Sequence, residues 1–397
     1  MATDPTAEPL DLNVDFFTGQ PYPLWARARD ECPVAPMDGS AMGADRPMVA
    51  VTRWEDVETV LRDGETFSSS INAEHIGQFM GDLMLAMDGK EHRSYRALVS
   101  HAFRPSQLEQ WDAALVRPTI ERLLDVIRPL GAADLVAAVT SQYPVEVILG
   151  IVGVPLADVA QFAQWAVEIN TGPLDPERGM IASQAMRDYL APIVEARRSE
   201  PTGDLISDMV HAEIDGEKLH DEKIYGFLRL LLPAGAETTF RAMGNALTAL
   251  LTVPGLYDRV VADRSLVPAL IEETLRWETS ITQVSRLAVR DTEIGGCPVA
   301  AGTAVSVLVA SANHDEARYP HAEEFDLDRP QQNQMTFGTG QHQCLGMHLA
   351  RMEMRTGIDA ILDALPNLRL DPDRPAPVIQ GLAFRGPDAI HVLYDPT

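Results

Sequence analysis

Residues 337–351 read FGTGQHQCLGMHLAR and place one cysteine, Cys344, in a glycine-rich turn directly ahead of a helical pattern. Glycine lets the backbone turn tightly and approach a flat ligand, because it has no Cβ. The apolar face of the predicted helix comprises Leu349, Met352, Ile358, Ile361 and Leu362. Cys344 is therefore expected near a helix N-terminus, where free N–H groups and the helix dipole favour an anionic sulfur. A thiolate held in this way is suited to ligate iron.

This stretch resembles the haem-binding loop of the cytochrome P450 family, whose pattern is F-x-x-G-x-H-x-C-x-G-x-x-x-A. The matching residues are Phe337, Gly340, His342, Cys344, Gly346 and Ala350. In this family the cysteine thiolate ligates the haem iron and pushes electron density that favours O–O cleavage. The resemblance implies a soluble bacterial type of P450 with heme b (iron protoporphyrin IX), Cys344 as the metal ligand, and Gly338 in the same cofactor-binding loop.

Two other interpretations of the turn are a buried structural cysteine and half of a zinc site. His342, Cys344 and His348 are of residue types that bind zinc. The three lie in one loop and lack the second pair of ligands that zinc sites usually have. The turn therefore favours a haem ligand.

Length and the resemblance together bound the fold. For 397 residues, length alone favours roughly two or three domains. The resemblance covers about residues 15–395 and implies one catalytic domain over 1–397, mainly α-helical with small β-sheets. In that fold the haem lies between a long central helix and the helix after the cysteine loop. We expect residues 1–14 to be poorly ordered and no chain to remain for a fused reductase.

The composition indicates a soluble, cytoplasmic protein. Lys and Arg number 32 against 58 Asp and Glu, a formal net charge of −26. Such an acidic surface disfavours nucleic acid and anionic membranes as partners. Three scattered cysteines do not suggest a disulfide framework, and the N-terminus lacks a signal-peptide pattern. The longest uncharged apolar stretch, 242–257, is too short to span a bilayer.

Hydrophobic periodicity predicts helices over 22–31, 54–63, 106–128, 140–152, 156–170, 180–198 and 221–253. A strand is predicted at 48–51, and a hairpin-like run passes through Gly295-Gly296 to Val305. Regular signals lapse over 68–87, and Thr171-Gly172-Pro173 breaks the helical pattern. The resemblance implies that the helices beside this break form a mobile lid over the substrate, with Pro173 to Arg178 in the loop between them.

A second group of residues is predicted to bind the haem propionates. His92 and Arg96 lie four residues apart and share a helical face. Buried carboxylates need charge-assisted donors, and the family supplies them from a His-x-x-x-Arg motif here and from an arginine that Arg286 matches. Gly89-Lys90 and Gln334 depart from the family, which often has two prolines and a histidine there, although glutamine can still donate. A solvated helix face is the alternative for His92 and Arg96.

The stretch 230–239, LLLPAGAETT, lies within the predicted long helix and is apolar on nearly every face, which indicates burial. Pro233 and Gly235 cost about 3 and 1 kcal/mol relative to alanine in a helix interior. The Thr238 hydroxyl can return to the carbonyl of Ala234 and loosen the helix locally. We therefore expect a polar notch in an apolar helix.

The family has such a notch over the haem iron, with the pattern A-G-x-[D/E]-T. Ala234, Gly235, Glu237 and Thr238 match it. The resemblance implies that Thr238 positions the water that delivers protons to dioxygen, that Glu237 relays protons from solvent, and that Ala234 borders the haem. Many relatives have Asp in place of this Glu. The alternative for Glu237 is a buried ion pair with Arg241.

The resemblance also implies structural and substrate-binding residues. Glu273 and Arg276 form an E-x-x-R motif, which the family joins to an arginine that Arg329 matches. The predicted substrate-lining residues are Met80, Leu83, Met84, Leu231, Ala234, Thr282, Val284 and Leu382. Methionines give an adaptable apolar lining, and ordinary core packing is the alternative for each of them.

Together the motifs imply a haem-thiolate monooxygenase that inserts one oxygen atom from O2 into a lipophilic small molecule by hydroxylation or epoxidation. Electrons would come from NAD(P)H through a reductase and a 2Fe-2S or similar ferredoxin. Arg93, Arg351 and Arg355 are candidate docking cations, with a solvated surface as the alternative. Two other functions are a peroxide-driven peroxygenase, which usually lacks the acid–alcohol pair, and a haem protein that senses gas or transfers electrons.

Overall fold

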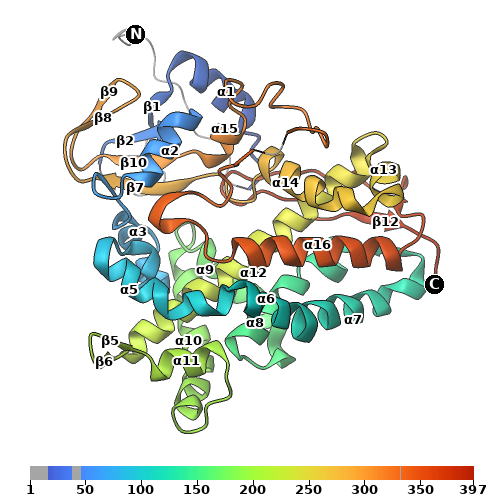
Figure 1. Ribbon diagram of the computed structural model, residues 1–397, viewed down its shortest axis with the longest axis horizontal. Coiled ribbons are helices and arrows are strands. Elements are labelled where there is room, and N and C mark those ends of the chain that lie inside the picture. Colours follow the sequence, from blue (N-terminus) through green and yellow to red (C-terminus); the bar gives the residue numbers. More distant parts are fainter. Residues whose placement is uncertain (1–16, 38–45, 331) are drawn as a thin grey trace.

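The computed structural model describes residues 17–37, 46–330 and 332–397, so the predicted N-terminal segment 1–14 lies outside it. The helices are α1 (Tyr22–Glu31), α2 (Trp54–Arg62), α3 (Ile71–His75), α4 (Gly77–Met80), α5 (Gly89–Ser100), α6 (Pro105–Trp111), α7 (Arg117–Ile127), α8 (Tyr143–Val152), α9 (Val159–Asn170), α10 (Pro176–Ser199), α11 (Leu205–His211), α12 (Asp221–Thr252), α13 (Leu256–Ala262), α14 (Val267–Trp277), α15 (Val309–Asn313) and α16 (Met347–Ala364). The strands are β1 (Val34–Met37), β2 (Met48–Val51), β3 (Phe67–Ser68), β4 (Ala132–Asp134), β5 (Glu213–Ile214), β6 (Glu217–Lys218), β7 (Val284–Ala288), β8 (Thr292–Ile294), β9 (Cys297–Val299), β10 (Ala304–Val307), β11 (Arg369–Leu370) and β12 (His391–Leu393). The prediction of a mainly helical chain with small sheets is confirmed (Figure 1).

The largest sheet lies at one side of the molecule, beside α1, α2 and α15 (Figure 1). Its strand order is β1-β2-β10-β7-β3, with β2 and β10 parallel and the other neighbours antiparallel. Leu287 of β7 lies opposite Ser68 of β3. The sheet therefore holds Arg286, one residue earlier in β7, close to the end of β3.

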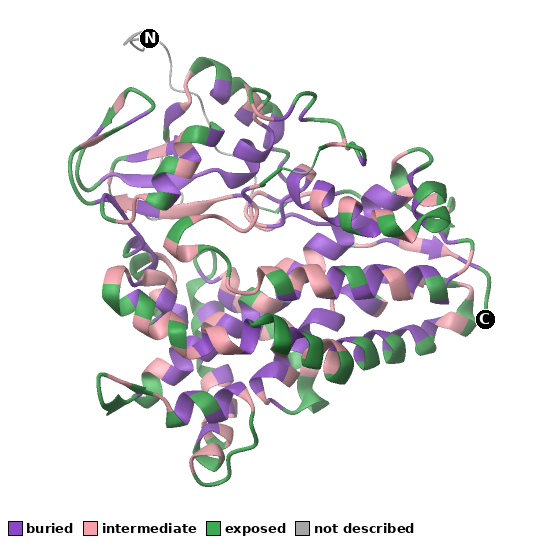
Figure 2. Cartoon of the chain, in the orientation of Figure 1, coloured by how far each residue is buried: buried purple, intermediate pink, exposed green. Residues whose placement is uncertain are grey.

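α12 is the centre of the helical part and packs against α8, α9, α14 and α16. Figure 2 shows it buried along most of its length. A Cβ on Gly235 would lie 2.8 Å from Ile148 Cγ1, so close packing against α8 requires this glycine. The helix runs unbroken for 32 residues through Pro233. The predicted long helix is therefore confirmed, because packing by neighbouring helices offsets the low helix propensity of proline and glycine. The local loosening near Thr238 stays a prediction.

Several predicted elements agree with the structure, and the differences have local causes. α1 and β2 have the predicted bounds, whereas the predicted helix 106–128 contains a π-helical turn at 112–116 between α6 and α7. Short helices α3 and α4 occupy part of 68–87. The predicted loop Pro173–Arg178 is too long, because α10 begins at Pro176. Proline suits the first helical turn, and the Asp175 side chain caps the helix by accepting from Arg178 N–H.

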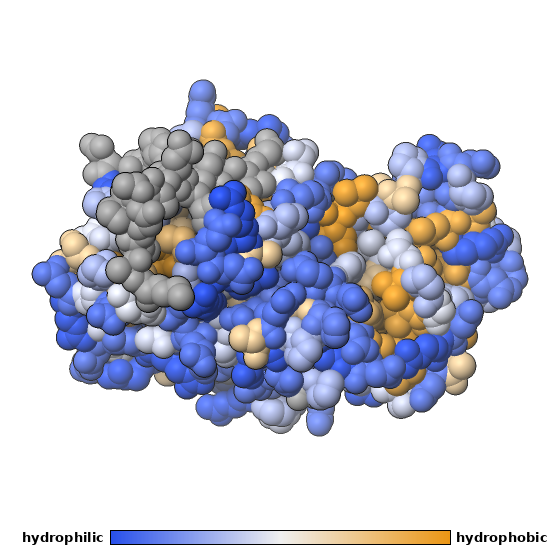
Figure 3. Space-filling model, turned by 90° about the horizontal axis from the view of Figure 1, so that it is seen from above, coloured by the Kyte–Doolittle hydropathy of each residue, from blue (hydrophilic) through white to orange (hydrophobic). Residues whose placement is uncertain are grey.

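The surface is largely hydrophilic on the face seen in Figure 3, with separate apolar patches. Across residues 17–37, 46–330 and 332–397, no helix combines the length and apolar character needed to cross a membrane.

Glu273, Arg276 and Arg329 meet in a buried cluster. Glu273 Oε1 lies 2.7 Å from Arg276 Nη2 and 3.0 Å from Arg329 Nε. Arg276 also donates to the carbonyl oxygens of Asn313 and Ala322. The cluster therefore joins α14 to the chain that runs from α15 toward the cysteine loop.

We expect Glu273→Gln to lower the free energy of unfolding by about 3–5 kcal/mol, because it leaves two buried guanidinium groups without their counter-charge. The matched control is Glu58→Gln on α2, whose partner Arg62 is 62% exposed. An exposed pair of this kind contributes less than about 1 kcal/mol. Urea denaturation of both variants measures the difference, and equal losses would contradict a structural role for the buried cluster.

Candidate active site

Cys344 lies in a turn just ahead of α16. Its backbone N–H donates to Phe337 O at 2.8 Å, which closes the turn. Protein atoms packed around the Cys344 thiol desolvate it and raise its pKa, although the residue keeps accessible surface; a hydrogen bond from Gly346 N–H and the charges of Arg96 and Arg351 oppose this rise. A further positive partner, such as a bound metal ion, would stabilise the thiolate.

Open space adjoins the cysteine turn. A Cβ added to Gly338 or Gly346 would meet no atom within 4 Å, and Cys344 itself is exposed. Gly346 has φ −86°, so neither its backbone conformation nor packing within the described chain requires glycine. Close approach of a flat ligand gives a reason for it. Gly340 differs, because its φ is +74° and a Cβ would collide with the carbonyl oxygen of Leu61, at the end of α2.

Three residues predicted to bind the propionates, His92, Arg96 and Arg286, gather beside this turn together with His342 of the cysteine loop. The rings of His92 and His342 lie 4.1 Å apart, and Arg96 Nη2 donates to Gln343 O at 2.7 Å. Burial and repulsion from His342 and Arg96 lower the pKa of His92 to about 4. Burial lowers the pKa of Arg286 to about 10. Burial thus disfavours the positive charge of both groups, and a bound anion would oppose this effect.

Two of the buried side-chain nitrogens that lack a hydrogen-bond partner within the described structure are His92 Nδ1, in this cluster, and Gln334 Nε2, in the segment before the cysteine turn. Gln334 Oε1 accepts from Thr336 N, which leaves the amide nitrogen to donate elsewhere. Carboxylates of a bound molecule would satisfy such donors and balance the buried cations. The residues present therefore fit the two propionates of a haem.

Asp88 brings a carboxylate into this region, although it is not among the predicted site residues. Its Oδ1 lies 3.1 Å from Gln341 Nε2 and 3.4 Å from His342 Nε2. Burial tends to raise the pKa of Asp88, but hydrogen bonds from His342, Ser68 and Ser69 outweigh this effect and lower it. Asp88 is therefore an anion that lies among two arginines and two histidines.

On α12, accessible surface occurs at the predicted notch. Ala234 is exposed and Thr238 partly exposed, whereas Pro233, Ala236 and Glu237 are buried. Thr238 Oγ1 donates to Ala234 O at 2.8 Å, as predicted. The notch is thus formed by the side chains of Ala234 and Thr238 on a continuous helix.

Glu237 is 3% exposed and has partners on both of its oxygens. Arg241 Nη2 lies 2.8 Å from Oε1, which is the ion pair named as the alternative. Asn170 of α9 donates to Oε2 at 2.7 Å. The sequence has no pattern that predicts this contact, because Asn170 lies 67 residues before Glu237.

The predicted substrate-lining residues divide into two groups. Met80, Leu83, Met84 and Leu231 are buried in the main hydrophobic core. Thr282 hydroxyl donates to Leu382 O, and Val284 begins β7 beyond it. The structure thus brings the segment 281–284 together with the turn at 381–384.

Phe79 of α4 lies between α10 and α12. A Cβ on Gly172 or Gly179 would lie 3.0 Å from the Phe79 ring, so this ring occupies a socket that glycines make possible. Ser183 hydroxyl donates to Phe79 O and accepts from Arg229 Nη1 at 3.1 Å. These contacts were not predicted, because they join segments that are distant in sequence.

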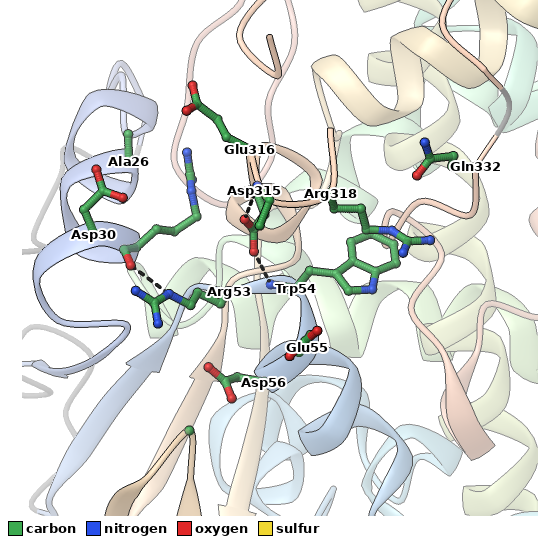
Figure 4. Close-up of a pocket in the computed structure, with 13 residues that line it drawn as sticks. Ala26, Asp30, Arg53, Trp54, Glu55, Asp56, Asp315, Glu316, Arg318 and Gln332 are labelled. Carbon is green, nitrogen blue, oxygen red and sulfur yellow. Dashed lines mark hydrogen bonds between the residues drawn. The ribbon is translucent and has the colours of Figure 1, made fainter. Parts of the chain in front are cut away.

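A polar surface pocket of about 730 Å³ lies elsewhere, between α1, the start of α2 and residues 315–318 (Figure 4). Its acidic residues are Asp30, Glu55, Asp56, Asp315 and Glu316. Arg318 stacks on Trp54 at 4.0 Å from the ring centroid. None of the predicted site residues lines this pocket, and its polarity does not suit a lipophilic ligand.

In the part of the chain that the structure describes, no group of three or more His, Cys, Asp or Glu could hold a metal ion. His342, Cys344 and His348 therefore do not form a zinc site there.

Comparisons with known proteins agree with this geometry. The family model for cytochrome P450 matches residues 173–381. Putative cytochrome P450 YjiB of Bacillus subtilis is 33% identical over 357 residues, which are 88% of this chain and 88% of that protein. The mycinamicin IV hydroxylase/epoxidase of Micromonospora griseorubida is 32% identical over 353 residues, 87% of this chain and 89% of that protein. The solved structure of CYP109Q5 from Chondromyces apiculatus has a TM-score of 0.85 and 31% identity, covering 95% of this chain and 96% of that one.

The sequence motifs, the fold and the relatives thus point to the same family, and the cysteine turn and the basic cluster fit the cofactor that this family binds. The chain belongs to the cytochrome P450 family and is a monooxygenase with heme b as its cofactor.

Proposed function

We propose that this monooxygenase hydroxylates or epoxidises a lipophilic small molecule, with O2 as the oxygen source and electrons from NAD(P)H through a reductase and a ferredoxin. The observation that carries the proposal is that Thr238, which directly follows Glu237 in the sequence, lies on the accessible face of a buried helix. Relatives support the substrate class. The mycinamicin IV enzyme is named a hydroxylase/epoxidase, and CYP109E1 of Bacillus megaterium, 29% identical with a TM-score of 0.83, has been solved with testosterone.

In this proposal each group of the site has a separate task. Cys344 would ligate the iron, while His92, Arg96, Arg286 and His342 would hold the propionates, with Gln334 Nε2 as a further donor. Phe337, Gly338, Gly346 and Ala350 would border the haem on the cysteine side and Ala234 on the α12 side. When bound, the haem supplies the iron that activates dioxygen.

Thr238 and Glu237 would control protons. Thr238 Oγ1 gives its proton to Ala234 O, so its lone pairs are available to accept from a water. Glu237 is held by Arg241 and Asn170, so one of its oxygens would have to leave a partner before it relays a proton. Met80, Leu83, Met84, Leu231, Thr282, Val284 and Leu382 would supply or support the substrate-facing surface.

The electron donor would dock near the cysteine turn. Arg93 and Arg355 are exposed and could meet an acidic ferredoxin. Arg351 is a weaker candidate, because it pairs with Glu272 at 2.5 Å and lies 4.6 Å from the centroid of the Phe337 ring. We also propose that residues 1–397 act as one catalytic domain in the cytoplasm, where NAD(P)H is available.

The electron route can be tested by comparing turnover with hydrogen peroxide against turnover with NADH, reductase and ferredoxin. Substrates for this test come from a screen of lipophilic compounds for a spin-state shift in the haem absorbance spectrum. The proposal expects faster product formation with the ferredoxin system. Efficient turnover with peroxide alone would instead indicate a peroxygenase.

Thr238→Ala should uncouple electron use from product formation, because the water that delivers protons loses its hydroxyl partner. The matched control is Thr252→Ala, since Thr252 makes the same four-residue back-bond, to Thr248 O at 2.6 Å, near the end of α12. The measurement is product formed per NADH consumed, together with the peroxide released. Undiminished coupling in Thr238→Ala would contradict the assigned role.

Glu237→Gln separates proton relay from structural pairing. General acid–base catalysis contributes typically 10²- to 10⁴-fold, so a relay predicts a fall of about that size in the rate of product formation. If Glu237 serves only to pair Arg241, urea denaturation should show a less stable protein that retains the wild-type rate.

A further inference from the structure

Asp88 occupies a junction of three segments that are distant in sequence. It directly precedes α5, yet its side chain does not cap that helix. Its Oδ2 instead accepts from Ser68 Oγ at 2.6 Å and from Ser69 N at 3.0 Å. These bonds anchor the start of α5 to the end of strand β3.

The other oxygen of Asp88 holds the cysteine turn. Oδ1 accepts from Gln341 Nε2 at 3.1 Å and lies 3.4 Å from His342 Nε2. Gly64 makes room for this contact, because a Cβ there would collide with the Gln341 amide. Gln341 is therefore enclosed between Gly64 and Asp88, three residues before Cys344.

The charge of Asp88 also reaches the residues that we assign to the propionates. It acts on His92 and His342, and it is the charged neighbour that favours the protonated form of Arg286. α5, which Asp88 precedes, carries both His92 and Arg96. One carboxylate thus contacts the sulfur-bearing turn and begins the helix that carries two of the propionate donors.

We propose that Asp88 is a positioning residue for the haem. One of its oxygens fixes it to β3, the other holds the cysteine turn through Gln341, and its negative charge lowers the reduction potential of the iron. A nearby anion stabilises the ferric over the ferrous state, because the ferric state has one more positive charge. The inference rests on the propionate assignment made above.

The substitution Asp88→Asn tests both the positioning of the haem and the effect of the negative charge on the reduction potential. Asparagine retains size and an acceptor oxygen for Ser68 and Ser69, but it removes the charge and presents N–H groups to the donors of Gln341. A hydrogen bond to a charged group contributes enough that its loss should accelerate haem transfer to apomyoglobin about ten- to a hundred-fold. The reduction potential should become more positive.

Two further variants separate the hydrogen bond that Asp88 accepts from Gln341 from the effect of its negative charge. Gln341→Leu removes the donor and keeps the carboxylate, so haem release should accelerate while the potential stays at the wild-type value. Asp263→Asn is the matched control, because Asp263 is exposed and accepts from Ser265 N and Oγ at 3.0 and 2.6 Å, with the same chemistry as Asp88. It should change neither quantity.

The inference would be overturned if Asp88→Asn released haem at the wild-type rate and had the wild-type reduction potential. If Asp88→Asn does not fold, Gln341→Leu decides, since unchanged haem release in that variant overturns the positioning role. All variants are compared with wild-type protein whose spectrum shows thiolate ligation. A wild-type protein without that spectrum would instead remove the proposed function itself.

Discussion

An anionic sulfur inside a protein needs positive partners, and the site around Cys344 is built on that requirement. Desolvation by the surrounding protein raises the pKa of this thiol, while the Gly346 N–H and the charges of Arg96 and Arg351 act in the opposite direction. Iron in haem is the partner that this family provides. A cofactor that also carries two carboxylates then explains why buried cations and unpaired donors gather beside the same turn.

The rest of the fold holds this turn from several sides. Glu273 joins α14 to the segments that lead to the turn through two arginines. Gly340 allows it to dock on the end of α2, and Asp88 links it to β3 and α5. α12 is packed by α8, α9, α14, α16 and further helices, and it remains accessible at Ala234 and Thr238. Contacts that hold the site from several elements suit a reaction in which protons and water must be controlled.

Sequence reasoning succeeded where the signal is local. The position of Cys344 ahead of α16 and the bond from Thr238 to Ala234 both follow from spacings of a few residues. It also predicted the long helix through Pro233, which tertiary packing keeps continuous. It missed Asn170, which meets Glu237 across 67 residues, and Gln341, which meets Asp88 across 253. Such pairings have no periodic pattern in one sequence, because the topology of the fold creates them.

The central claim is that the sulfur of Cys344 ligates a haem iron. The most direct measurement is the absorbance spectrum of the purified, reduced protein under carbon monoxide. Thiolate ligation predicts the red-shifted Soret band that is typical of this family, and Cys344→Ala should lose it. The band of an imidazole- or thiol-bound haem in the wild-type protein, or the absence of haem, would contradict the account.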